Sequence, residues 1–186
     1  MEHSDHSIIG CHYDGYGVAI TLVESFGEDR YHILENWHKS EPAARFQVVD
    51  KCDELFHQEK AKQKRKIEIF INNSLVLETV LNEVLKVCPS PVKIASILAD
   101  EAFTLINSLF AEQKISLSQH TLSLKKDLRR YDPLLINQNH QIHSIFNSVA
   151  QAEFNRITIP KPHYSVSGRF KRGSHYTFLS DSDWDD

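Results

Sequence analysis

The sequence lacks long apolar runs, phosphate-binding glycine loops and a signal sequence, and each absence excludes a class of protein. No stretch approaches the roughly 18 consecutive apolar residues of a membrane helix, so no membrane span is predicted. The six glycines are scattered and form no GxxxxGK[ST] motif, which argues against a P-loop nucleotide site. The first residues, MEHSDHSIIGCHYD, are polar and acidic, so we expect no secretory signal peptide there.

Cysteines are few, and their spacing argues against a structural role. Cys11, Cys52 and Cys88 are odd in number and far apart, and they form no CxxC pair. A disulfide framework and a structural zinc knuckle are therefore not expected. A reducing compartment, the cytoplasm, suits this cysteine usage best.

The remaining composition is that of an ordinary globular domain. The chain has 186 residues, of which 41% are apolar, so it is long enough to bury one core. Ten phenylalanines and many aliphatic residues exclude disorder for most of the chain. The formal charge of −4 differs from the strongly basic balance of a dedicated nucleic-acid-binding domain. Eleven histidines leave metal binding and pH-sensitive charge open.

The pattern of apolar residues predicts a three-stranded meander followed by alternating helices and strands. Residues 7–12, 18–24 and 31–37 are β-rich and are separated by tight turns, which is typical of an antiparallel meander. Further elements are expected at 40–60 (helix), 67–71 (strand), 74–87 (helix), 100–113 (helix), 115–118 (strand), 121–131 (helix) and 139–154 (helix). The segment 92–98 is ambiguous between strand and helix.

Helical spacing also predicts core residues. It places Phe46 and Phe56 in the core under the first helix, and Val84 under the second. The predicted fold class is α/β with a mixed sheet, and the ribonuclease H-like fold has this order of elements. We expect one such domain over residues 1–160, and a flexible tail over 161–186 that is first basic and then acidic.

Polar residues stand at three places where a ribonuclease H-like nuclease carries acids. Such an enzyme binds two divalent metal ions with acids at three places. The first acid is on the first strand, the second follows the strand that comes after the first crossover helix, and the third is on the last helix. Here the first place reads His12-Tyr13-Asp14 and the second reads Asn72-Asn73. The third reads Asn139-His140-Gln141-Ile142-His143.

On these residues the sequence resembles the C-terminal nuclease domain of the phage terminase large subunit, the motor-nuclease that packages viral DNA. Residues 10–15, GCHYDG, are similar to the Gly-x-Asp-Tyr-Gly strand of the family, and residues 139–144, NHQIHS, to its Asn-His-x-x-Asp-Ala helix. Residues 124–131, LKKDLRRY, are similar to its Glu-Leu-x-x-Tyr stretch. The resemblance covers about residues 7–154.

The resemblance implies a fold, a cofactor and partners. It implies a ribonuclease H-like fold, Mg²⁺ or Mn²⁺ as cofactor, and double-stranded DNA as a partner. It further implies a packaging ATPase or a portal-type protein as a partner. It implies no membrane association, and a location in the cytoplasm of the host cell. The ATPase half of a terminase is not part of this sequence.

The sequence departs from the family at the metal-binding acids. His12, Asn72 (or Asn73) and His143 stand at the three acid positions, which removes the negative charge that attracts Mg²⁺. Asp14 lies two residues beyond His12 and becomes the first acid if the register shifts by two. His140 matches the histidine of the family's last helix.

Three interpretations of this cluster remain open. The first is a vestigial cleft that does no chemistry. The second is an altered site that binds Zn²⁺, Mn²⁺ or Ni²⁺ through Asp14, His12, His140 and His143. The third is a working Mg²⁺ nuclease in which Asp14 is joined by another acid, for which the candidates are Glu68, Asp100 and Glu101.

The function predicted first is a terminase-nuclease-like domain of viral DNA packaging and cleavage with an impaired or altered metal site. One alternative is a non-catalytic DNA- or protein-binding module on a nuclease fold. Another is an active metal-dependent endonuclease or junction resolvase that uses Asp14. Cations neutralise phosphates, so DNA contacts are predicted at Lys62, Lys64 and Arg65 and at Lys125, Lys126, Arg129 and Arg130.

Overall fold

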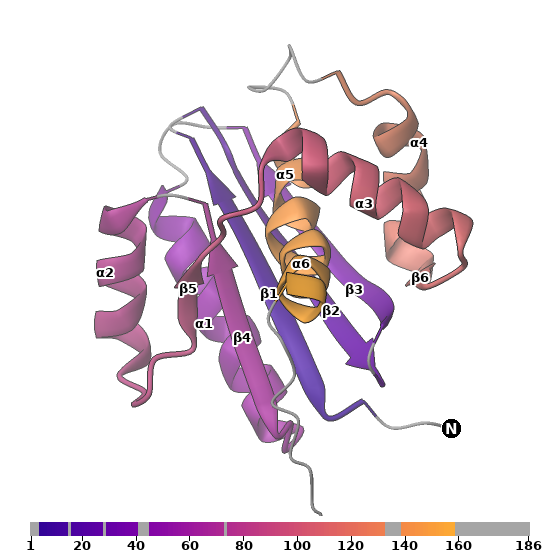
Figure 1. The fold of residues 1–186 in the computed structure, drawn as a ribbon. Helices are drawn as coiled ribbons and strands as arrows, with labels where there is room; N and C mark the ends of the chain where they lie inside the picture. Colours follow the sequence, from indigo (N-terminus) through magenta and orange to yellow (C-terminus); the bar gives the residue numbers. More distant parts are fainter. Residues whose placement is uncertain are drawn as a thin grey trace, which may run out of the picture.

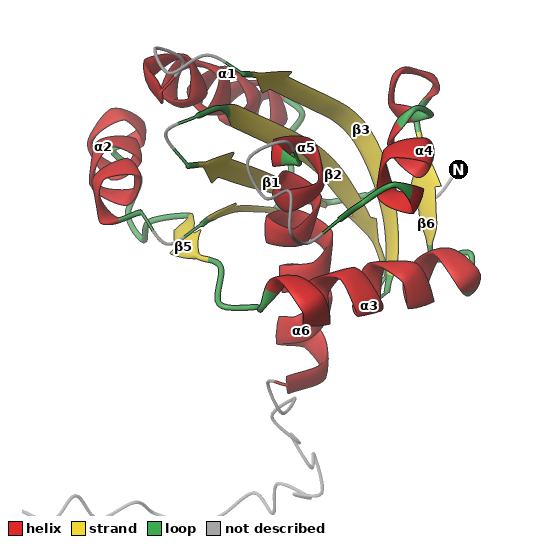
Figure 2. Ribbon diagram, turned by 90° about the horizontal axis from the view of Figure 1, so that it is seen from above, coloured by secondary structure: helices red, strands yellow, loops and turns green. Residues whose placement is uncertain are grey.

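The computed structural model describes residues 4–14, 16–27, 29–40, 45–72, 74–132 and 139–158. The tail predicted at 161–186 and the helix start predicted at Glu41-Pro42 lie outside these residues. A mixed six-stranded sheet forms the centre of the molecule, and helices cover both of its faces (Figures 1 and 2). In the described part, no helix is both long enough and apolar enough to cross a membrane.

The sheet confirms the predicted meander and adds parallel neighbours to it. Its strands are β1 (His6–Tyr13), β2 (Val18–Phe26), β3 (Arg30–Lys39), β4 (Lys66–Ile71), β5 (Val92–Ile94) and β6 (Ile115–Leu117). Their order is β5-β4-β1-β2-β3-β6. β2 pairs antiparallel with β1 and with β3, whereas β4 is parallel to β1 and β6 is parallel to β3. The ambiguous segment 92–98 begins as a strand, β5, which extends the parallel side.

The helices lie close to their predicted positions, with two differences. They are α1 (Arg45–Ala61), α2 (Leu75–Leu85), α3 (Ala99–Ala111), α4 (Leu124–Arg129), α5 (His140–Ile145) and α6 (Gln151–Thr158). The helix predicted at 121–131 is shorter, because a 3₁₀ turn, η2 (Gln119–Thr121), precedes α4. The helix predicted at 139–154 contains a π-helical turn, η4 (Phe146–Ala150), between α5 and α6.

Two cores lie on the two faces of the sheet, because alternate residues of a strand point to opposite sides. Ile9 and Cys11 of β1 pack with α1 and α2 on one face. Ile8 packs with α3, α5 and η4 on the other face. The residues of β2 from Val18 to Val23 are all buried, so this strand is covered on both sides.

Two residues predicted in the core are exposed instead. Phe46 is 65% exposed and Val84 is 43% exposed. Helical spacing identifies one side of a helix, but it does not show how far the sheet extends beneath that side. Phe46 lies in the first turn of α1, and Val84 lies on a flank of α2, beside the buried stripe of Leu77, Leu81 and Leu85.

Glu68 connects three neighbouring strands of the sheet. Its carboxylate lies 3.0 Å from Nε2 of His6 on β1, 2.7 Å from Nζ of Lys66 on β4 and 2.5 Å from Nζ of Lys93 on β5. Burial alone raises the pKa of Glu68, but hydrogen bonds from these three groups outweigh burial and hold the pKa well below its usual value. The Glu68 carboxylate is therefore ionised and fully engaged.

Replacing Glu68 with glutamine is expected to lower the free energy of unfolding at pH 7 by about 2 kcal/mol, because the ion pairs to Lys66 and Lys93 are lost. The folded pKa is depressed, so the contribution of Glu68 is present above about pH 4.5 and is lost as the pH falls below it. Urea unfolding at several pH values measures both effects. Wild type and variant that lose stability in parallel below about pH 4.5 would contradict this role.

Candidate metal centre

Polar side chains from β1 and α5 meet where β1 ends. The helix α5 crosses β1 and β2 on the face of the sheet opposite to α1 and α2 (Figure 2). The crossing is close, since a Cβ atom on Gly10 would lie 2.2 Å from the backbone oxygen of Ser144. A glycine inside the strand thus allows α5 to lie directly on β1.

Asp14 follows β1 and is held by its own turn. Its Oδ1 atom accepts hydrogen bonds from the backbone N–H groups of Tyr16 (2.9 Å) and Gly17 (3.2 Å). Its Oδ2 atom faces two imidazoles, at 3.3 Å from Nδ1 of His140 and 3.8 Å from Nε2 of His12. The turn therefore fixes one carboxylate oxygen and presents the other to the histidines.

His12, Asp14 and His140 form a compact group of potential metal ligands. Their ligand atoms all lie within 4.8 Å of one another. His12 is 7% exposed and His140 is 3% exposed. The three atoms, His12 Nε2, Asp14 Oδ2 and His140 Nδ1, are buried and have no hydrogen-bond partner among the described residues. Buried polar atoms are nearly always partnered, so three such atoms that face one another without hydrogen bonds make this group a candidate metal site.

His143 lies one helical turn after His140 and stacks on His12. The two ring centroids are 4.8 Å apart, and the ring planes differ by 22°. Its Nε2 atom is also buried without a partner in the described part, although His143 is not one of the three clustered ligands. The edges of Tyr131 and Phe146 contact its ring. His143 therefore fixes the orientation of His12 from the side of the helix.

The surroundings keep two of the imidazoles neutral. Burial and the nearby His143 lower the pKa of His12 to about 3, although Asp14 opposes this effect. Burial and the nearby His140 lower the pKa of His143 as well. At neutral pH both rings carry a free lone pair, which is the form of histidine that binds metal ions.

Asn72 lies at the end of β4, but its amide is used by the backbone of β1. The amide Oδ1 accepts from the Tyr13 N–H at 2.9 Å, and Nδ2 donates to the Tyr13 carbonyl at 2.6 Å. The side chain thus extends the pairing of β4 with β1 beyond the last residue of the strand. Asn147 of η4 has a similar role, because its Nδ2 donates to the carbonyl of Cys11 at 2.6 Å. Asn73 lies outside the described residues.

The other acids considered from the sequence are not in the cluster. Glu68 is bound to His6 and to two lysines, and Asp100 and Glu101 lie in the first turn of α3. Asp14 is therefore the one carboxylate in the group of described ligands. A pair of Mg²⁺ ions needs several oxygen ligands, so this donor set does not fit the two-metal centre that the resemblance implied.

The first basic segment lies at the end of the sheet away from His12. The side chain of Lys64 is only 8% exposed, and its Nζ atom contacts Glu24 at 2.6 Å and the Ser4 carbonyl at 2.8 Å. Lys62 is paired with Glu59, and Arg65 lies 3.5 Å from Asp5. These cations precede β4, whereas the cluster lies where β1 ends, beside the end of β4.

The second basic segment lies on the same side as the cluster. The helix α4 packs against α5. Four cations on α4 and directly after it are exposed and form no ion pair with a described residue: Lys125, Lys126, Arg129 and Arg130. Arg130 also lines a small hollow with Asn139 and Gln141, the two neighbours of His140 in the sequence. The predicted DNA contacts on α4 therefore lie near the candidate centre.

Two glycines that sequence reasoning did not select shape the centre. Gly10 allows α5 to approach β1, and a Cβ atom on Gly17 would lie 2.6 Å from the imidazole of His140. An isolated glycine inside a predicted strand is a known sign of close backbone approach, so Gly10 carried a usable signal. Gly17 did not, because glycine is common in turns.

Known proteins match the chain in fold. No protein-family model matches it, and no curated protein matches it in sequence. The large terminase of a thermophilic bacteriophage matches with a TM-score of 0.58 at 11% identity, over 83% of this chain and 39% of that chain. The same terminase in complex with ATP-gamma-S matches with a TM-score of 0.57 at 10% identity, over 83% of this chain and 41% of that chain. The human cytomegalovirus terminase nuclease domain matches with a TM-score of 0.49 at 13% identity, over 83% of this chain and 84% of that chain.

The chain thus spans about two fifths of the length of the phage terminase that it matches. At sequence identities this low, the similarity to these proteins concerns the fold alone. The mixed sheet predicted from the sequence and the resemblance to a terminase are both confirmed at that level, and the chain has a ribonuclease H-like fold.

Proposed function

We propose that this chain is a terminase-nuclease-type domain that handles DNA in viral packaging and that holds one transition-metal ion where related nucleases hold two Mg²⁺ ions. The observation that carries the proposal is the convergence of His12 Nε2, Asp14 Oδ2 and His140 Nδ1 within 4.8 Å, all three buried and without a hydrogen-bond partner among the described residues. The terminase fold supports the link to packaging.

The donor set favours a transition metal. Imidazole suits Zn²⁺ and Ni²⁺, whereas Mg²⁺ prefers oxygen ligands. Ligands of a tetrahedral zinc ion are about 3.4 Å apart, and Asp14 Oδ2 lies 3.3 Å and 3.8 Å from the two imidazole nitrogens. The three ligand atoms lie within 4.8 Å of one another, so side-chain shifts that bring them to this spacing would form the site. When bound, the ion supplies Lewis acidity toward a phosphate oxygen.

The protein's own residues provide the rest of the site. The turn at Asp14 orients the carboxylate, and His143 holds the ring of His12 by stacking. The cations of α4 offer a surface for the DNA backbone beside α5, where phosphate contacts are independent of sequence. DNA lying along α4 would pass the cluster.

A specific observation favours a second candidate function. Three protein ligands leave one coordination position free, which is the arrangement of catalytic rather than structural zinc sites. A single-metal endonuclease or junction resolvase that uses Asp14 is therefore the catalytic alternative to a DNA-binding module.

The test combines plasmid nicking with DNA binding. We expect no nicking in Mg²⁺, and we expect binding to a labelled duplex that weakens about tenfold in the combined variant Lys126→Gln, Arg129→Gln and Arg130→Gln. The matched control, Lys62→Gln with Arg65→Gln, changes exposed cations at the other end of the sheet and should leave binding close to wild type.

Each outcome of this test has a distinct meaning. Nicking in Mn²⁺ or Zn²⁺ but not in Mg²⁺, abolished by EDTA and by Asp14→Ala, would identify the catalytic alternative. Nicking in Mg²⁺ that Asp14→Ala abolishes would contradict the transition-metal site. Duplex binding lost in the control but kept in the α4 variant would contradict the placement of DNA.

A further inference from the structure

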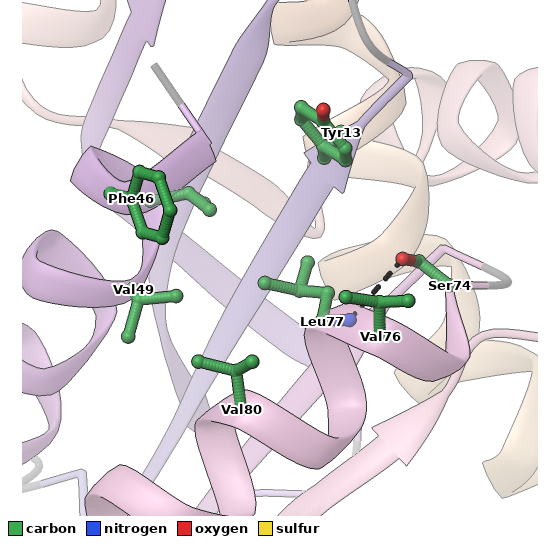
Figure 3. A pocket seen from close by; sticks show the side chains of 8 residues that line it. Tyr13, Phe46, Val49, Ser74, Val76, Leu77 and Val80 are labelled. Carbon is green, nitrogen blue, oxygen red and sulfur yellow. Dashed lines mark hydrogen bonds between the residues drawn. The ribbon is translucent and has the colours of Figure 1, made fainter. Parts of the chain in front are cut away.

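An apolar groove lies between α1 and α2, on the face of the sheet opposite to α5. Its volume is about 380 Å³. Val49 of α1 and Leu77 of α2 form its buried floor, Phe46 and Val76 line its walls, and Tyr13 closes one end (Figure 3). The groove belongs to the apolar core on this face and is separate from the metal cluster.

The walls of the groove expose large apolar side chains. Phe46 is 65% exposed and Val76 is 75% exposed, and the two face the same space from different helices (Figure 3). The helix α2 also exposes Leu75 (69%) and Val84 (43%). Single exposed apolar residues are ordinary, but Phe46 and Val76 lie together at a concave site, which indicates an interaction surface.

Unpaired acidic side chains accompany the groove. The helix α2 contains Glu78 and Glu83 and no basic residue, and Asp50 follows Val49 on α1. None of these three carboxylates forms an ion pair with a described residue, whereas Lys51, next to Asp50, is already bound to Glu35 and Glu54. Lys60 and Lys86 also form no ion pair with a described residue, but they lie in the last turn of α1 and at the C-terminal end of α2. The unpaired charges nearer to the groove residues are therefore negative.

We propose that this groove is the docking site of a partner protein segment whose apolar side chains are flanked by lysine or arginine. An amphipathic helix that lays its apolar face in a groove is a common mode of recognition. Apolar anchors would contact Phe46, Val76 and Val80, and basic residues beside them would neutralise the carboxylates. A nucleic acid suits this surface poorly, because its phosphates would face the same acids. The inference does not depend on the metal centre.

The experiment uses a synthetic peptide of leucine and lysine, about four helical turns long, with leucines along one face. We expect it to bind the full chain in a fluorescence anisotropy titration. Val76→Arg should reduce the affinity about tenfold or more, because it places a positive charge where the apolar anchor docks. Val76 is 75% exposed, so this variant should fold, and circular dichroism verifies that it does. Leu122→Arg, at a 61% exposed apolar site in another part of the molecule, is the matched control and should bind like wild type.

Charge is tested separately from apolar contact. The pair Asp50→Asn and Glu83→Gln should weaken binding of the lysine peptide and reduce its dependence on salt. A leucine–glutamate peptide with the same apolar face should bind far more weakly. Equal binding of the two peptides, or no binding of either, would overturn the proposal. Self-association of the wild type that Val76→Arg abolishes would also overturn it, because the occupant would then be a second copy of this chain.

Discussion

Replacing Asp14 with asparagine is expected to weaken binding of Zn²⁺ or Mn²⁺ by roughly 100-fold or more, while the fold remains intact. An asparagine retains an oxygen that can accept from the N–H groups of Tyr16 and Gly17, so the turn persists. The amide nitrogen then takes the place of Oδ2, the one negatively charged donor of the cluster, and it cannot bind a cation. The variant thus removes a metal ligand and leaves intact the turn that orients this side chain.

Two measurements check this expectation on protein stripped of metal by a chelator. Calorimetric titration with Zn²⁺ should give one site in the wild type. In thermal unfolding, Zn²⁺ at about 100 times its dissociation constant should add about 2.7 kcal/mol to wild-type stability and little to the variant. His57→Asn, which changes an exposed histidine on α1, is the control and should bind like wild type. Equal affinity in Asp14→Asn and in the control would exclude Asp14 as a ligand.

The sequence predicted the elements of this fold well because their signals are local. Turn-forming residues in the sequence at 14–17 and 26–29 separate the strands of the meander, and apolar spacing predicts the helices. Burial depends on distant parts of the chain and was less predictable. Phe46 and Val84 have the spacing of core residues, yet both remain largely exposed in the folded chain. Lys64 was predicted to contact DNA, but its side chain is only 8% exposed and is paired with Glu24, 40 residues earlier.

For the candidate centre, one of the three interpretations of the sequence grouped His12, Asp14 and His140, and the structure brings these three side chains together. The nuclease interpretation instead treated His12 and Asp14 as alternatives for the first ligand. Because β1 ends at Tyr13 and Asp14 turns back, the two side chains face each other. Asn72 was predicted as a site residue from its position, and its engagement with Tyr13 depends on where the strands end. Such a detail is set by three-dimensional register and leaves no mark in the sequence.

Replacing Gly10 with alanine is expected to lower the free energy of unfolding by roughly 3 kcal/mol. The added Cβ atom would lie 2.2 Å from the Ser144 oxygen and 2.7 Å from the Ser148 nitrogen, both of which are backbone atoms that no rotamer change can move. The helix must therefore shift away from β1, and the packing of Ile145 and Val149 against the sheet is weakened. The same shift moves His140 away from His12 and Asp14, so metal affinity should fall by roughly tenfold as well.

Thermal unfolding should show a decrease in melting temperature of roughly 10 °C for Gly10→Ala. Ser116→Thr, which also adds one methyl group to a strand but at an exposed position on β6, should have little effect. In an open strand position the same glycine-to-alanine change would stabilise the protein by about 0.5 kcal/mol, because it restricts the unfolded chain. The sign of the measured stability change therefore tests whether α5 rests directly on β1. A stabilised variant would mean that it does not, and the ligands of the proposed centre would then not be held together by this crossing.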